Sequence, residues 1–288
     1  MTGSMTGGSD SAYRILMGLL EARTGQTLSP SRIWRIEMSL KPVLQAHKLA
    51  DMDALVAALV GGTDKSLLDD VIDAMLNNET FFFREHLLFD DIAATALDTL
   101  RQINAASRQL TIWHCGVSTG QEAYSLAMQL AEQQDRWAGW TIDIIGTDVS
   151  RRAIARARAG IYSQFEIQRG LPAQRMVRWF DQTDAGWLAK ADLRRRVEFS
   201  VQNLLIDRPP LPRPADLVFC RNVLLYFAPD TRQKAFARVR SVAARHAFLV
   251  LGAGETVLGQ TDQFVASRRL RGLYEPADLH PAPLARSA

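Results

Sequence analysis

The sequence predicts an α/β protein with a doubly wound, mostly parallel sheet, preceded by a small all-helical domain. Beyond about Phe89, short β-branched runs alternate with amphipathic segments, a pattern typical of parallel strands joined by right-handed helical crossovers. Before about Asn77, apolar residues recur at helical spacing and strand patterns are absent. A chain of 288 residues with 47% hydrophobic content is long enough to build one large domain and a smaller one.

The helical region begins near Ser11, where Leu16, Leu19 and Leu20 share one helix face. Helix-breaking pairs at Ser29-Pro30, Gly61-Gly62 and Asn77-Asn78 divide it into roughly four short helices. We therefore expect an N-terminal helical domain over residues 1–88, with a disordered start over about residues 1–10.

The second domain is expected over residues 89–288, with its ligand site beyond the carboxyl ends of the strands. The region from residue 163 to residue 196 is long for one connection and predicts an inserted subdomain over about 165–196. The expected strands lie in "QLTIWHC", "WTIDIIGTD", "RRVEFSVQ", "ADLVFCRN" and "AFLVLGAG", and the expected helices span Glu122 to Gln134, Ser150 to Ala159 and Asp230 to Ala244.

Composition and simple motifs give no support to several classes of function. A net charge of +3 is too small to argue for nucleic acid. Cys115 and Cys220 lack a CxxC or histidine spacing, so we expect reduced thiols and no metal site. No run of about 18 apolar residues and no signal-peptide pattern occurs, which predicts a soluble, cytoplasmic protein.

Two acids follow the first two expected strands. Glu122 comes after a turn in which Gly116 and Gly120 allow the backbone to approach a ligand, but Thr119 and Glu122 also match a helix capping box. Asp148 occupies a position where doubly wound folds often bind ribose hydroxyls, or it caps the following helix. Two acids at adjacent strand ends favour a shared ligand over two independent caps.

Two further stretches carry polar residues beside apolar ones. In "NNETFFFRE", Asn78, Thr80 and Arg84 flank three phenylalanines, which we expect to be buried. In "FCRNVLLYF", Arg221 and Asn222 end a later strand, and Tyr226 lies four residues on, roughly one helical turn. Each stretch alone also fits an apolar core with a polar edge.

Five stretches follow one another in a fixed order: "NNETFFFRE", "WHCGVSTGQEAYSLAM", "GTDVSRRAIARARAGIYS", "VEFSVQNLL" and "FCRNVLLYF". Taken together, they resemble the CheR family, the chemoreceptor glutamate methyltransferases of bacterial chemotaxis. The resemblance implies a Rossmann-like S-adenosylmethionine (SAM)-dependent methyltransferase domain, with S-adenosylhomocysteine as product and no metal. By these motifs, the implied SAM contacts are Asn78, Thr80, Arg84, Glu122, Asp148, Asn203, Leu204, Arg221 and Asn222.

Methyl transfer from SAM to a glutamate side chain fits the lack of an evident histidine or cysteine nucleophile. SAM is already activated and a glutamate carboxylate is already charged at neutral pH, so no general base is needed. The enzyme has to align the reactants and exclude water. We expect Arg84 to orient the incoming carboxylate and Tyr226 to donate a hydrogen bond near the methyl group or the acceptor.

The resemblance implies that the substrates are the cytoplasmic domains of chemoreceptors or similar sensors, with adaptation of signalling as the result. Residues 31–50 hold Arg32, Arg35, Lys41 and Lys48 against Glu37 alone, which forms either a basic docking face or a solvated helix. A second basic cluster, from Arg151 to Arg158, fits a solvated surface better than a nucleic-acid site.

Departures from the family pattern are "STGQEAYS", where "STGEEPYS" is usual, and "GAGE", where "GHSE" is usual. The insertion around residues 181–196 is short and lacks a glycine-rich pattern, which argues against docking of a receptor's C-terminal tether. The alternative function is a non-catalytic SAM-binding signalling module. A methyltransferase for nucleic acid or a small molecule is a third possibility, but an NPPY-type loop is missing.

Overall fold

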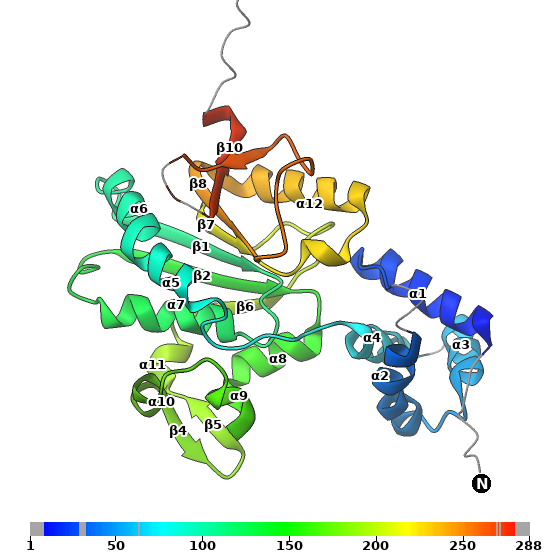
Figure 1. The fold of residues 1–288 in the computed structure, drawn as a ribbon. Coiled ribbons are helices and arrows are strands. Elements are labelled where there is room, and N and C mark those ends of the chain that lie inside the picture. Colours follow the sequence, from blue (N-terminus) through cyan, green and yellow to red (C-terminus); the bar gives the residue numbers. More distant parts are fainter. Residues whose placement is uncertain (1–8, 29–32, 63, 269, 271, 280–288) are drawn as a thin grey trace, which may run out of the picture. The chain divides into compact units, whose positions relative to one another are not determined.

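A computed structural model describes residues 9–28, 33–62, 64–268, 270 and 272–279 of the chain. By their contacts these residues separate into two units (Figure 1). Among the described residues, the first unit contains those up to Asn77 together with Tyr226–Ala228, and the second contains Asn78–Leu225 and those from Pro229 onward. The division therefore falls at Asn77–Asn78, before the boundary that the sequence analysis put at residue 88.

The first unit is helical over its described residues, as predicted. Its helices are α1 (Asp10–Thr24), α2 (Ile33–Ala46), α3 (Met52–Gly61) and α4 (Lys65–Met75). The side chains of Ser9, Asp51 and Asp64 each accept a hydrogen bond from a backbone N–H in the first turn of the helix that follows. Of the predicted disordered start, residues 1–8 lie outside the described residues, whereas Ser9 and Asp10 form the cap and first residue of α1.

A short segment from the later part of the chain joins this helical unit. Phe227 forms an isolated antiparallel bridge with Gln26, and the backbone N–H of Thr27 donates to the carbonyl of Tyr226 at 2.8 Å. The Asn77 amide also donates to the Tyr226 hydroxyl. Both the backbone and the side chain of Tyr226 are therefore bonded to residues of the helical unit.

The second unit is built on a seven-stranded sheet in the order β6-β2-β1-β7-β8-β10-β9. The first five strands run parallel, and β10 and β9 continue antiparallel at one edge. All five predicted strands are present. The strands are β1 (Gln109–Cys115), β2 (Thr141–Asp148), β6 (Val197–Val201), β7 (Ala215–Cys220), β8 (Ala243–Leu251), β9 (Phe264–Ala266) and β10 (Leu273–Pro276).

Helices cover both faces of this sheet. Figure 1 shows α7 (Gln121–Glu132) and α8 (Arg151–Ala159) on one side of the strands and α12 (Pro229–Val242) on the other. The strand order runs outward in opposite directions from β1 to β2 and from β1 to β7, so the carboxyl ends of these strands flank the topological switch point. The predicted doubly wound α/β class is confirmed.

The inserted region folds into a second, three-stranded antiparallel sheet in the order β3-β5-β4. The sequence indicated an elaboration here but not its strands. Its elements are β3 (Ile161–Tyr162), α9 (Gln164–Gln168), α10 (Ala173–Trp179), β4 (Phe180–Thr183), β5 (Gly186–Ala189) and α11 (Ala191–Arg194).

Other elements of the second unit were not predicted. A continuous helical stretch precedes the sheet, formed by α5 (His86–Asp91), the π-helix η2 (Ile92–Ala96) and α6 (Leu97–Ile103). Short 3₁₀ turns η3 (Leu224–Tyr226) and η4 (Ala277–Leu279) complete the described elements. No helix in the described part of the chain combines the length and apolar character that a bilayer crossing needs.

Candidate active site

The turn between β1 and α7 has a backbone that only a few residue types adopt easily. Gly116, Ser118 and Gly120 all have positive φ, at 71°, 54° and 94°. A Cβ on Gly116 would lie 2.3 Å from a methyl of Val223, so the close approach of the loop after β7 requires glycine here. Gly120 is the N-cap of α7, without a side-chain cap, and the capping-box alternative for Thr119 and Glu122 is therefore wrong.

Asp148 ties this turn to the end of β2. Its two carboxylate oxygens accept hydrogen bonds from the backbone N–H of Ser118 at 2.8 Å and of Ser150 at 2.9 Å. The cap of α8 is Ser150, whose hydroxyl accepts from the N–H of Ala153, so Asp148 is not the cap. Asn78 joins the same corner, because its carbonyl accepts from the Ser118 hydroxyl at 2.7 Å.

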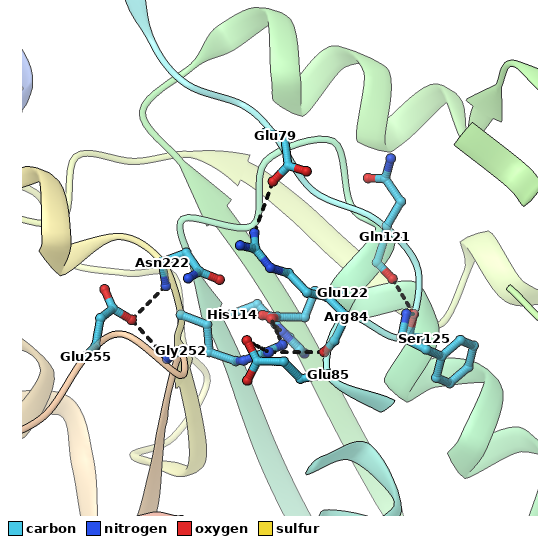
Figure 2. A network of polar contacts seen from close by, with 12 residues as sticks. Glu79, Arg84, Glu85, His114, Gln121, Glu122, Ser125, Asn222, Gly252 and Glu255 are labelled. Carbon is cyan, nitrogen blue, oxygen red and sulfur yellow. Dashed lines mark hydrogen bonds and ion pairs between the residues drawn. The ribbon is translucent and has the colours of Figure 1, made fainter. Parts of the chain in front are cut away.

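Glu122 lies in a buried ion-pair network at the carboxyl ends of β1 and β7 (Figure 2). One carboxylate oxygen is 3.0 Å from His114 Nδ1, and the other accepts from Arg221 Nη1 at 2.8 Å. Burial opposes the charge on this carboxylate, but the Arg221 guanidinium and the His114 ring outweigh it. The pKa of Glu122 therefore lies below its ordinary value.

Arg221 connects Glu122 to the aromatic motif. Its side chain is only 1% exposed, and its Nη2 is 3.1 Å from the Glu85 carboxylate and donates to the Arg84 carbonyl at 3.0 Å. Two opposing carboxylates raise the pKa of Arg221 in spite of its burial, so the guanidinium stays charged. Among the described residues, Arg221 Nε and His114 Nε2 are buried polar atoms without a hydrogen-bond partner.

The loop after β7 is held by a single carboxylate. Glu255 Oε2 accepts from the backbone N–H of Asn222 at 2.7 Å and of Gly252 at 2.9 Å, as Figure 2 shows. Its Oε1 accepts from the N–H of Leu224 at 2.8 Å and of Leu225 at 3.2 Å. Burial raises the pKa of Glu255 against the lowering effect of these hydrogen bonds. The four bonds fix the backbone that carries Arg221 and Asn222.

The expected helical turn from Asn222 to Tyr226 does not form. Asn222 has a φ of 58°, in the left-handed region, and only residues 224–226 make a 3₁₀ turn. Gly252 accommodates this conformation, since a Cβ there would lie 2.6 Å from the Asn222 amide nitrogen. Tyr226 then belongs to the helical unit, as described above.

The remaining predicted residues lie around these contacts. The Arg84 side chain, 28% exposed, points toward Glu79, and its Nη1 donates to that carboxylate at 3.2 Å (Figure 2). Asn203 caps its own loop by accepting from the N–H of Leu205 at 3.0 Å. Leu204 is buried and Thr80 is half-buried. Asn203 and Leu204 follow β6, whose neighbour β2 ends at Asp148.

Several residues of this network were not found from the sequence. Charge networks of this kind depend on partners far apart in the chain, as with Arg221 and Glu122, which are 99 positions apart. The "GAGE" departure was the one sequence signal for Glu255. The missed residues are Glu85, His114, Ser150 and Glu255.

Comparison with known proteins identifies the class of this site. Residues 78–271 match a family model described as "CheR methyltransferase, SAM binding domain", so the second unit is a SAM-dependent methyltransferase domain. The matched range contains every strand of the parallel sheet and all the contacts described for the site.

Relatives match over most of their length. A chemotaxis protein methyltransferase of Vibrio parahaemolyticus is 34% identical over 89% of this chain and 93% of that protein. Chemotaxis protein methyltransferase 1 of Pseudomonas aeruginosa is 31% identical over 88% of this chain and 92% of the relative. The chain therefore belongs to the CheR methyltransferase family and is a SAM-dependent methyltransferase enzyme.

Proposed function

We propose that this enzyme methylates the γ-carboxylate of glutamate side chains on the cytoplasmic helices of chemoreceptors, and that it acts in the cytoplasm. Its relatives carry the name chemotaxis protein methyltransferase. The main support for a carboxylate substrate is the half-buried Arg84 guanidinium, which forms an ion pair with Glu79 beside the network of Glu122 and Arg221. A cation in that place is suited to an anionic acceptor.

The residues at the strand ends fit SAM by the chemistry of their groups. SAM presents an ammonium group and ribose hydroxyls, for which Asp148 and Glu122 offer carboxylates on adjacent strand ends. Asn78 and Asn222 add amide side chains, and Leu204 adds an apolar surface. We propose Asn78, Thr80, Arg84, Glu122, Asp148, Asn203, Leu204, Arg221 and Asn222 as the SAM site.

The geometry of Arg221 refines its part in this proposal. Its guanidinium forms ion pairs or hydrogen bonds with Glu122, Glu85 and the Arg84 carbonyl. We propose that Arg221 acts mainly by holding Glu122 and the Arg84 backbone in place, and that Glu122 then meets SAM from a fixed position.

The chemistry asks the protein to position and desolvate the reactants. SAM supplies a methyl group on a cationic sulfur, so the carboxylate oxygen bonds to carbon while the carbon–sulfur electron pair stays on sulfur and no proton moves. Arg84 orients the substrate carboxylate, and Tyr226 is the proposed hydrogen-bond donor to the acceptor. Among the described residues, no group of three or more His, Cys, Asp or Glu could hold a metal ion.

We assign receptor recognition to the helical unit and the SAM site to the second unit. On α2, Lys41 is exposed, as are Trp34 at 61% and Met38 at 69%. The acid in this segment, Glu37, accepts a hydrogen bond from the Tyr13 hydroxyl at 2.5 Å and is thereby held against α1. This leaves a basic and apolar helix face suited to an acidic receptor helix. Arg32 of the predicted basic face lies outside the described residues.

We do not assign binding of a receptor's C-terminal tail to the inserted subdomain. Only Asp184 and Ala185 connect β4 to β5, so the inserted sheet offers no long loop to enclose a peptide.

The test is transfer of tritiated methyl from SAM to membranes that contain the host's receptors, with base-labile release of methanol as the sign of a methyl ester. We expect labile label with the wild type and its loss in Arg84→Ala. SAM binding without any transfer, across the full set of receptors, would contradict the proposal and favour a non-catalytic module.

A further inference from the structure

Two arginines from different parts of the catalytic domain share one carboxylate. Glu79 Oε1 is 2.5 Å from Arg169 Nη2, and Glu79 Oε2 is 3.2 Å from Arg84 Nη1. The Phe81 ring supports both cations, with its centroid 4.3 Å from Arg169 Cζ and 5.6 Å from Arg84 Cζ. Figure 2 shows the Arg84 side chain extending toward Glu79.

The backbone holds the two arginines in a fixed relation. Arg169 is the C-cap of α9 in the inserted subdomain, and Gly170 follows it with a φ of 80°. A Cβ on Gly170 would lie 2.0 Å from the Phe82 carbonyl oxygen, so the two chain segments are in direct contact. The position of Arg169 beside the aromatic motif is therefore set by packing that only glycine permits.

The carboxylate between the arginines remains accessible. Glu79 and Arg169 are each 42% exposed, and Arg84 is 28% exposed. Ion pairs exposed to this extent contribute little to stability, so their exchange for an equivalent ion pair costs little. A side chain that served only to attach the inserted subdomain would not need two accessible cations on one carboxylate.

We propose that Arg84 and Arg169 form a clamp for the carboxylate of the substrate glutamate, and that Glu79 occupies this clamp until the substrate displaces it. The inference rests on the proposed function, because only a carboxylate substrate has a reason to use the clamp. Guanidinium groups bind carboxylates through paired, charge-assisted hydrogen bonds, so two of them position both oxygens of the acceptor.

The clamp also accounts for release of the product. A glutamate methyl ester carries no charge, so it no longer forms an ion pair with either arginine. Glu79, tethered at high effective concentration, then returns to the clamp. Glu79 thus lowers the apparent affinity for unmethylated substrate, and it favours departure of the methylated one.

Steady-state methylation of a soluble cytoplasmic receptor fragment tests the clamp, with KM for the fragment and Kd for SAM measured on each variant. We expect Arg169→Gln to raise the KM about tenfold or more with Kd for SAM unchanged, and Arg169→Lys to recover part of the loss. Glu79→Gln is expected to lower the KM several-fold, since it removes the competing anion. Arg178→Gln and Asp184→Asn, exposed on the same subdomain, are the charge-matched controls.

If the wild type methylates the fragment, any one of three results overturns the clamp. The first is a KM in Arg169→Gln equal to that in Arg178→Gln, and the second is a loss of SAM affinity in Arg169→Gln. The third is a rise in KM for Glu79→Gln. The last would make Glu79 a structural tie. Urea unfolding of each variant separates these results from loss of the fold. A wild type that binds SAM yet forms no ester overturns the proposed function, and the clamp with it.

Discussion

At the scale of single residues, Arg221 is a buried cation at the centre of the site. It is almost fully buried and holds two carboxylates, Glu122 and Glu85, that approach it from different elements. A buried charge is tolerated only when its partners compensate for lost hydration. Removal of this one side chain therefore leaves two acids without their counter-ion at the centre of the site.

We expect Arg221→Ala to lower the free energy of unfolding by about 3–5 kcal/mol, because it uncouples buried charges. Urea unfolding followed by circular dichroism measures the change. Arg213→Ala is the matched control, since Arg213 pairs with Asp143 at 2.7 Å in a half-exposed place and is expected to cost about 1 kcal/mol or less. Equal losses in the two variants would contradict the network described here.

The lowered pKa of Glu122 predicts a pH dependence of stability. Burial opposes its charge but Arg221 and His114 overcome that effect, so the folded state favours the carboxylate relative to the unfolded chain. The stabilisation is present above the ordinary value of 4.5 and is lost as pH falls through the lower folded value.

The wild type should therefore lose more stability than Glu122→Gln as the pH falls from above 4.5 through the lowered folded pKa of Glu122. Urea unfolding at half-unit pH steps gives both curves. Parallel curves would mean that the carboxylate is not selectively stabilised in the folded protein.

At the scale of elements, the loop after β7 depends on a carboxylate supplied after β8. Glu255 accepts four backbone N–H groups from residues 222, 224, 225 and 252. These bonds hold Asn222 in a left-handed backbone conformation that asparagine tolerates better than most residues. The geometry of one strand end is thus set by its neighbour in the sheet.

Glu255→Gln is expected to weaken SAM binding about tenfold or more, since an amide NH₂ replaces one acceptor and leaves buried N–H donors unsatisfied. Calorimetric titration with SAM measures the effect. Glu198→Gln, on the exposed face of β6, should bind SAM as the wild type does. An unchanged affinity in Glu255→Gln would show that the loop does not need this anchor.

At the scale of the whole molecule, we assign recognition of the receptor to the helical unit and the SAM site to the second unit. If α2 steers an acidic partner, Lys41→Glu should lower kcat/KM for receptor fragments by several-fold at low ionic strength, with a smaller effect at high salt. Affinity for SAM should stay the same. Lys234→Glu, exposed on α12, makes the same charge change in the catalytic unit and is the control. A loss that does not depend on salt would argue against electrostatic steering.

Local patterns in the sequence were sufficient to predict the fold class. The alternation of β-branched runs with amphipathic helices predicted the five parallel strands, and helical spacing predicted α1 to α4. The short strands β3, β4, β5, β9 and β10 escaped prediction, because each spans only two to four residues and is stabilised by pairing with another strand rather than by its own pattern.

In the site, too, local sequence patterns predicted some features and contacts between distant residues determined the others. The sequence by itself determined that Asp148, Glu122 and Arg221 stand near strand ends, since strand and turn signals are local. Only the tertiary structure decided that Glu122 pairs with Arg221 and His114, that Glu79 bridges Arg84 and Arg169, and that Tyr226 joins the helical unit. These outcomes depend on burial and on contacts between segments far apart in the chain, where desolvation and opposing charges select the partners.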